Sequence, residues 1–318
     1  MQIHYLYPKY YGNEHGAGDC IFDTNLISAL RNIGNTVYEE PIPRKRKAIF
    51  SAPIWESKIT GYSIDNNHLK NKRSEIIISH ESLFATLKLF EEQSASIIVH
   101  NYFPRFSFKG RMDIEFLYKA GSIGYFERAF RKARHIFFLS KMDARQAEKD
   151  FPFIRGNYSI LTPPAGKVPK AGRNLNHLHI SGSDKWLPKR ISNITMKTKE
   201  KLEKKDFLLL DFKESMKSGF GLITDRFSVG FKLKLMQMIY FGDIILTRSD
   251  VQEEIDYIAP NYKFIYRYST EESLIELVSR LREELKDNEF AINLGEKFKD
   301  IEALTWESQA KLVMESFC

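Results

Sequence analysis

The stretch 225–250 passes from a polar loop to an almost wholly apolar segment and then to a short apolar run. Between Phe231 and Phe241 the apolar positions cover nearly every face of a helix, and Gly242 can end that helix with little steric penalty. The following run 244–246, Ile-Ile-Leu, is typical of a parallel strand buried on both faces. The pattern therefore predicts a loop, a buried helix, a tight turn and a buried strand.

The polar exceptions in this segment fall on one side of the helix. Gly230, Lys234 and Gln237 are spaced i, i+4 and i+7 and therefore share one stripe. A cation and an amide near a helix N-terminus, which itself favours anions, suit a phosphorylated ligand. A core helix whose lysine extends its charged end to water is the alternative interpretation.

Apolar runs alternate with helical spacings along the rest of the chain, which predicts parallel sheets covered by helices on both faces. The stretch 163–176, rich in proline, glycine, lysine and asparagine, interrupts this alternation and is interpreted as a linker. The expected strands are 2–7, 36–39, 75–79, 96–100, 135–140, 158–162, 177–181, 207–212, 219–225, 244–246 and 263–266. The expected helices outside the opening stretch are 23–32, 81–92, 113–132, 141–149, 271–285 and a last one with apolar residues at Trp306, Ala310, Val313 and Met314. The expected domains are 1–163 and 177–305, joined by a linker at 164–176 and followed by a C-terminal helix over 306–318.

The composition is that of an ordinary globular protein, with 318 residues, 43% hydrophobic and 28% charged, enough for two domains. Two cysteines, Cys20 and Cys318, argue against a disulfide framework and fit a reducing cytoplasm. The N-terminal residues lack the pattern of a secretory signal. No apolar run approaches the roughly 18 residues that a membrane span requires. We therefore expect a soluble cytoplasmic protein.

The formal net charge of +7 favours anionic partners, namely nucleotides, nucleic acid or an acidic membrane surface. The sequence has no helix-turn-helix, zinc-finger or RNP-like signature, so nucleic-acid binding rests on charge alone and is not expected. The basic run 44–47 is followed by Ile49, Phe50 and Trp55. This segment predicts either peripheral docking on the anionic inner face of a membrane or a solvated loop.

Four stretches carry a family resemblance, and three of them are in the second half of the chain. One stretch looks like the first loop of a nucleotide-binding domain and reads G-S-D-K-W-L-P-K-R at 182–190. Another looks like a helix-and-strand signature and reads K-L-M-Q-M-I-Y-F-G-D-I-I-L, within 228–246. The other two are the Trp-Glu helix within 305–314 and the stretch at 137–146, which reads F-F-L-S-K-M-D-A-R-Q. The order and spacing of the three stretches 182–190, 228–246 and 305–314 together resemble those of GT-B glycosyltransferases, and most closely the bacterial group-1 (GT4-like) enzymes.

The resemblance implies an α/β protein of the GT-B fold, with two Rossmann-like domains facing each other across a cleft. In such enzymes the N-terminal domain binds the acceptor and the C-terminal domain binds the nucleotide sugar. The last helix, here 306–318, crosses back to the N-terminal domain. No Asp-x-Asp motif is present, so the expected reaction is metal-independent, without a metal site and with no cofactor beyond the nucleoside-diphosphate sugar substrate.

The same resemblance gives the candidate donor site. Glycines allow the backbone to approach a diphosphate, and basic residues supply charge-assisted hydrogen bonds to it. The predicted donor-binding residues are Gly182, Ser183, Lys189, Arg190, Arg226, Ser228, Gly230, Lys234 and Gln237.

On the acceptor side, the argument rests on the carboxyl ends of parallel strands, where ligands of such sheets gather. His100 lies at one of these ends and is the candidate catalytic residue, because a histidine there can orient a hydroxyl or act as a base. A structural role is the alternative for a single histidine. The other acceptor-side candidates, from the glycine loop after the first strand and from the aromatic and basic segment 103–111, are His15, Gly18, Asn101, Arg105 and Lys109.

The chain departs from the family at the paired glutamates. Gln237 stands where the helix glutamate is expected and Val229 stands eight residues before it. An amide can still hydrogen-bond a ribose hydroxyl, without the charge. We therefore expect a glycosyltransferase that extends a glycan or lipid-linked acceptor in bacterial surface polysaccharide synthesis, such as capsule, O-antigen or exopolysaccharide. A non-catalytic GT-B-like protein that binds a nucleotide sugar or a glycan is the alternative.

Overall fold

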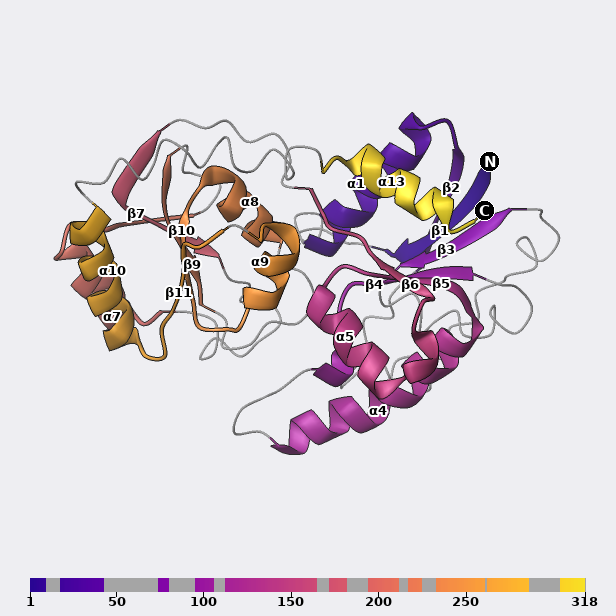
Figure 1. Cartoon of the computed structure of the whole chain (residues 1–318), viewed down its shortest axis with the longest axis horizontal. Helices are drawn as coiled ribbons and strands as arrows, with labels where there is room; N and C mark the ends of the chain where they lie inside the picture. The colour runs from indigo at the N-terminus through magenta and orange to yellow at the C-terminus, as the bar shows by residue number, and fades with distance from the viewer. Residues whose placement is uncertain are drawn as a thin grey trace. The chain divides into compact units, whose positions relative to one another are not determined.

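The computed structural model describes residues 1–9, 18–42, 74–79, 95–105, 112–164, 172–181, 194–211, 217–224, 233–260, 262–285 and 304–317. The chain forms two compact units (Figure 1). The first contains Met1–Pro163 and Trp306–Cys318, and the second contains most of the residues between them. Each unit is built around its own parallel sheet.

The first unit contains a six-stranded parallel sheet in the order β2-β1-β3-β4-β5-β6. Its strands are β1 (Gln2–Pro8), β2 (Thr36–Ile42), β3 (Glu75–Ser79), β4 (Ala95–Val99), β5 (Ala133–Phe138) and β6 (Tyr158–Ile160). Isoleucines in the central strands are buried whichever face they point to, as Ile76 and Ile78 enter one core while Ile77 enters the other. This is why the strands read as continuous apolar runs rather than as an alternating pattern.

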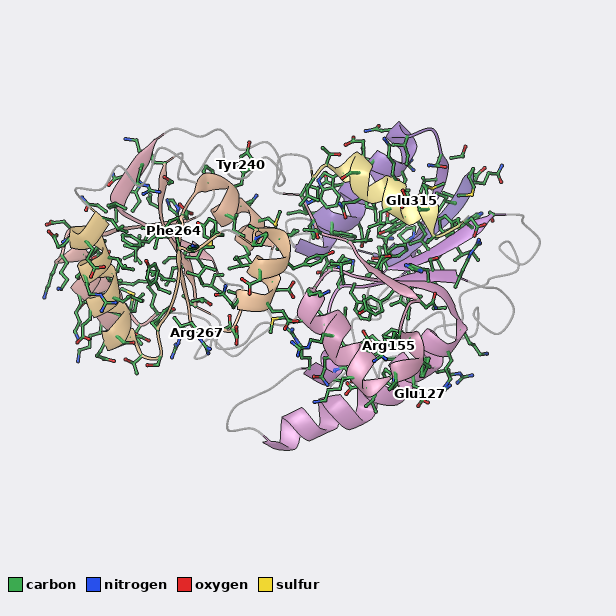
Figure 2. The ribbon with its side chains drawn as sticks, in the orientation of Figure 1. Glu127, Arg155, Tyr240, Phe264, Arg267 and Glu315 are labelled. Atoms are coloured by element: carbon green, nitrogen blue, oxygen red, sulfur yellow. The ribbon has the colours of Figure 1, made fainter. Side chains whose placement is uncertain are left out.

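Helices cover both faces of this sheet (Figure 1). On one face α4 (Met112–Lys132) and α5 (Lys141–Asp150) enclose a core that contains Phe126 and Phe138. On the other face α1 (Gly18–Asn32) and α13 (Trp306–Glu315) enclose the second core. Side chains fill the space between the sheet and each helical layer (Figure 2). Short 3-10 turns, η4 (Phe103–Arg105) and η5 (Pro152–Ile154), follow β4 and α5.

The last helix belongs to the first sheet, as the resemblance implied. Ala310 and Val313 of α13 are fully buried in the same core as Leu26 of α1. The Asn32 side-chain amide donates a hydrogen bond to Glu307 Oε1 at 3.3 Å, which joins the two helices at the surface. The chain therefore returns to its N-terminal unit after it has completed the second sheet.

The second unit contains a five-stranded parallel sheet in the order β11-β10-β9-β7-β8. Its strands are β7 (Arg173–Ser181), β8 (Leu208–Asp211), β9 (Ser218–Ile223), β10 (Ile244–Thr247) and β11 (Ile265–Arg267). Helices α7 (Met196–Glu203) and α10 (Glu271–Leu285) pack on one face, while α8 (Leu233–Phe241) and α9 (Gln252–Ile258) lie on the other (Figure 1).

The strand β7 begins at Arg173, within the stretch interpreted as linker from its composition. Its first residues, Arg-Asn-Leu-Asn, contain one apolar residue, so no strand pattern is visible there. Arg173 pairs with Ser218 of β9, and the register then shifts before Leu178. A register shift of this kind breaks the alternation on which sequence interpretation depends.

Two glycines of β9 allow close packing in the second unit. A Cβ atom on Gly219 would lie 2.5 Å from the His177 carbonyl oxygen, and one on Gly221 would lie 2.7 Å from Met238 Sδ. Gly242 ends α8 with a positive φ of 71°, as the sequence predicts for a residue that closes a helix. The fully buried Asp243 follows and accepts a hydrogen bond from the Gly219 N–H at 2.7 Å.

Both sheets have the strand order of doubly wound α/β folds. The order reverses between β1 and β3 in the first sheet and between β7 and β9 in the second. Such reversals leave a crevice at the carboxyl ends of the strands, where ligands bind. Within the described residues no helix is both long and apolar enough to cross a membrane. The expected helix 81–92 and the basic run 44–47 lie outside the described residues.

Candidate functional site

His100 lies at the carboxyl edge of the first sheet, directly after β4 and close to the reversal of strand order. Its side chain is only 2% exposed. The ring packs edge-on against Phe22 of α1, with 5.0 Å between ring centroids, and Phe22 in turn contacts Trp306 of α13. Elements from both ends of the chain thus fix the position of the imidazole.

A hydrogen-bond network determines the protonation of one ring nitrogen. The Ser79 hydroxyl donates to Asp23 Oδ1 at 2.6 Å, and the Tyr5 hydroxyl donates to the same oxygen at 2.8 Å. Because Ser79 has a single proton, its oxygen must accept in its other contact, with His100 Nε2 at 2.9 Å. His100 Nε2 therefore carries a hydrogen.

The other ring nitrogen, Nδ1, lies 3.4 Å from Asp19 Oδ1. An ionised carboxylate can only accept hydrogen bonds, so this contact places a hydrogen on Nδ1 as well. Burial alone lowers the pKa of His100, but the hydrogen bonds and charges of Asp19 and Asp23 outweigh it and raise the pKa to about 9. The ring is an imidazolium at neutral pH.

This protonation state bears on the two roles considered for His100. A general base must be neutral before it accepts a proton, and the two aspartates oppose the neutral form near pH 7. Both N–H groups already have partners, so the imidazolium can orient a hydroxyl by exchanging the 3.4 Å contact with Asp19, or it can hold the surrounding elements together. The geometry therefore favours an orienting or structural role.

The sequence analysis did not identify Asp19 and Asp23. They are spaced i, i+4 in the first turns of α1, so they lie on one face of the helix that follows the glycine loop. Asp23 is 1% exposed, whereas the Asp19 side chain is 26% exposed. Two acids at this spacing directly after a glycine loop were the available signal.

Arg105, an acceptor-side candidate, has a structural contact in the fold. Its Nε lies 2.8 Å from Oδ1 of the fully buried Asp143, with which it forms an ion pair. The Tyr102 N–H donates to Asp143 Oδ2 at 2.9 Å, and Ser140 caps the helix that carries Asp143. This ion pair holds η4 against the start of α5, and it explains the Ser-x-x-Asp pattern in the sequence.

The remaining acceptor-side candidates are only partly described. Asn101 is half-buried directly after His100, and Gly18 is the first residue of α1. His15 and Lys109 lie outside the described residues, so their place near His100 stays a prediction.

On the donor side, the described residues include the helix α8. Gln237 is partly exposed on α8, and Lys234 lies one turn earlier in the same helix. The Lys234 side chain is not described. The other donor candidates outside the described residues are Gly182, Ser183, Lys189, Arg190, Arg226, Ser228 and Gly230, together with the family position Val229. Their convergence stays a prediction.

Hydroxyl groups line the carboxyl edge of the second sheet. Thr224 follows β9, and its buried hydroxyl oxygen has no hydrogen-bond partner among the residues that the structure describes. At the end of β10 the Thr247 hydroxyl donates to the Ser249 carbonyl at 2.8 Å. The described residues contain no group of three or more His, Cys, Asp or Glu side chains placed to hold a metal ion.

Comparison with solved structures shows the fold. WaaG, "a glycosyltransferase involved in lipopolysaccharide biosynthesis", matches with a TM-score of 0.57 and 14% identity over 98% of each chain. Sucrose-phosphate synthase from Thermosynechococcus elongatus has a TM-score of 0.65 and 11% identity, over 99% of this chain and 98% of that one. Anabaena Alr3699/HepE, in complex with UDP and glucose, has a TM-score of 0.57 and 9% identity, over 100% and 99%.

These likenesses extend over the whole chain, and the protein has the two-Rossmann-domain GT-B fold implied by its sequence. No protein-family model matches the sequence. No curated protein matches it either.

Proposed function

We propose that this protein, which has the GT-B fold, is a metal-independent glycosyltransferase. It transfers a sugar from a nucleoside-diphosphate sugar to a glycan or lipid-linked acceptor. The acceptor belongs to a bacterial surface polysaccharide, namely a capsule, O-antigen or exopolysaccharide. The observation that supports the proposal is the full-length likeness to three solved structures. Of these, WaaG is described as a glycosyltransferase, and Alr3699/HepE is in complex with UDP and glucose.

On the donor side, the proposal assigns the diphosphate to the N-terminal end of α8. Lys234 and Gln237 share one stripe of this helix, and Arg190 belongs to the loop that follows β7. Backbone N–H groups, the helix dipole and two cations would stabilise the charge that develops on the leaving nucleotide. A metal ion is not needed for this step.

On the acceptor side, the proposal gives the His100 imidazolium the role of a hydrogen-bond donor that orients the reacting groups, with its Nδ1–H exchanging the 3.4 Å contact to Asp19 for one to the acceptor. The structure supports this because the ring is held by Asp19, Asp23 and Ser79 at a carboxyl edge. His100→Ala is expected to lower turnover while nucleotide affinity stays nearly intact. An unchanged turnover rate would leave His100 with a structural role alone.

The proposal is tested by incubating the purified protein with UDP-, GDP-, CMP- and dTDP-sugars. A thermal shift with one nucleotide sugar, followed by release of its nucleotide in the presence of a glycan acceptor, is the expected result. A ligand that binds the folded protein stabilises it by an amount that depends on the ratio of ligand concentration to Kd. Measuring the melting temperature at several ligand concentrations therefore gives the affinity. Absence of a shift with every nucleotide sugar would contradict the proposal.

A non-catalytic protein that binds a nucleotide sugar or glycan is the second candidate. The substitution of the family's helix glutamate by Gln237 favours it, as does the enclosure of His100 by its partners. Binding of one nucleotide sugar without turnover toward any acceptor would distinguish this candidate from an enzyme.

The proposed location is the cytoplasm, with peripheral contact to the anionic inner face of the membrane through the basic run 44–47. Co-sedimentation with vesicles that contain anionic lipid, compared with neutral vesicles, tests this contact. Replacing the four basic residues by glutamine is expected to abolish it, since each contributes about 1 kcal/mol near an anionic surface.

A further inference from the structure

The chain returns to the first unit at Trp306. Thr305 is the last residue of the second unit, and Trp306 is the first residue both of the returning segment and of α13. Helices α13 and α1 share one core on the same face of the first sheet (Figure 1). Trp306 is therefore the point at which the returning chain meets the helix that carries Asp19 and Asp23.

Two aromatic contacts connect Trp306 to His100. The ring centroids of Trp306 and Phe22 lie 5.4 Å apart, with 70° between the ring planes. The Phe22 and His100 rings lie 5.0 Å apart at 78°. Both are edge-to-face contacts, an arrangement that aromatic rings prefer at these separations. Phe22 is fully buried between its two neighbours, and because protein interiors are close-packed, removal of the indole would let Phe22 shift away from the imidazole.

The hydrogen bonds of His100 hold its two nitrogens unequally. Ser79 lies 2.9 Å from Nε2, whereas Asp19 Oδ1 lies 3.4 Å from Nδ1, which is long for a hydrogen bond. A tilt of the ring therefore alters the direction of the Nδ1–H group most. Phe22 packs against the ring and limits this tilt. Because Asp19 and Phe22 are three positions apart on α1, they lie on one face of that helix.

The other end of α13 is held by a contact that does not involve His100. Arg134 donates a hydrogen bond to the Phe317 carbonyl just after α13, and its guanidinium lies 5.5 Å from the Phe317 ring centroid. Arg134 also forms an ion pair with Glu75 at 2.8 Å. Both residues lie at the starts of their strands, so this contact is at the amino edge of the sheet, opposite the edge that carries His100. The two ends of α13 can thus be perturbed separately.

We infer that Trp306 is a positioning residue for the acceptor side, which acts through Phe22 to hold the His100 ring in the orientation from which Nδ1–H turns to the acceptor. The inference rests on the proposed function. Trp306 is not assigned a contact with either substrate.

The test compares Trp306→Ala with two matched variants of the full-length protein. Trp306→Phe keeps an aromatic ring at the same position, and Arg134→Ala removes the contact at the other end of α13. The NMR signals of isotope-labelled histidine rings report the environment of His100, whose signal is assigned by its absence in His100→Gln. Melting temperature, nucleotide affinity and turnover are measured as well, with the UDP-, GDP-, CMP- or dTDP-sugar and the glycan acceptor that the wild type uses.

Trp306→Ala is expected to shift the His100 ring signal and to lower turnover about tenfold, because a small misplacement of an orienting group is costly. Nucleotide affinity is expected to stay within about twofold of wild type, since the nucleotide is assigned to the second unit. Trp306→Phe is expected to restore both the ring signal and turnover. Arg134→Ala is expected to lower the melting temperature at least as much as Trp306→Ala, with the ring signal and turnover unchanged.

A double variant tests whether Trp306 acts through Phe22. Phe22→Leu is expected to lower turnover to a similar extent, and adding Trp306→Ala to it is expected to cause no further loss, because residues that act through one another are not additive. Unchanged turnover in Trp306→Ala would overturn the inference, and so would an equal loss in Arg134→Ala or multiplied losses in the double variant. In these cases the wild type still transfers a sugar and the proposed function stands. If the wild type transfers none, the proposed function fails and the inference fails with it.

Discussion

At the residue scale, the protonated His100 ties the stability of the first unit to pH. Its pKa is about 9 in the fold, against an ordinary value of 6.5, because Asp19 and Asp23 outweigh burial. A raised pKa contributes stability that is fully present below pH 6.5 and lost as the pH rises through 9. Across this window the free energy of unfolding is expected to fall by about 1.4 kcal/mol per pH unit from this group.

Urea denaturation of wild type and His100→Gln at several pH values measures this dependence. The difference between the two proteins isolates the contribution of His100 from those of other titrating groups. The difference is expected to be largest near pH 6 and to shrink toward pH 9. A difference that does not vary with pH would show that the fold does not raise the pKa of His100.

The donor side allows a second residue-scale prediction. Charge-assisted hydrogen bonds contribute roughly 1.5–3 kcal/mol and neutral ones roughly 0.5–1.5 kcal/mol. Lys234→Ala is therefore expected to weaken nucleoside-diphosphate binding about ten- to a hundredfold, and Gln237→Ala less. Titration of each variant with each nucleoside diphosphate measures both effects. Unchanged affinity in Lys234→Ala would mean that the lysine only extends its charged end to water.

At the element scale, the glycines of β9 determine how closely its neighbours approach. A Cβ on Gly219 would lie 2.5 Å from a backbone oxygen, whereas one on Gly221 would meet the flexible side chain of Met238. Gly219→Ala is expected to destabilise the protein by about 1–3 kcal/mol, and Gly221→Ala by less. Gly124→Ala, in α4 with nothing within 4 Å of its Cβ, is the control and is expected to stabilise by about 0.5–1 kcal/mol. The free energy of unfolding of each variant is measured by chemical denaturation. A Gly219→Ala variant as stable as wild type would contradict this order.

The elements also show what sequence could and could not predict. The helix α8, Gly242 and β10 were recognisable because burial on all sides leaves a continuous apolar pattern and the turn requires a positive φ. The first residues of β7 were not recognisable, because a register shift breaks their pattern. His100 was identified by its place at a strand end, whereas its bonds to Asp19 and Asp23 depend on how α1 packs on the sheet.

At the scale of the whole molecule, the chain closes its first core with its last helix. The fully buried Val313 of α13 lies in the core that contains Leu26 of α1, nearly the whole length of the chain away in sequence. A charge at this position would be buried without a partner, which costs several kcal/mol. Val313→Asp is therefore expected to destabilise the first unit, while the core of the second unit, which contains Val278 of α10, keeps its contacts.

Hydrogen exchange resolved by segment measures this separately for each unit. Amides of α1 and α13 are expected to lose protection in Val313→Asp, while those of α10 keep the protection seen in wild type. Lys311→Asp, which places the same charge on the exposed side of α13, is the control and is expected to leave both helices protected. Equal loss of protection in α10 would show that the two cores do not unfold separately. The effect of the last helix would then extend to the whole molecule.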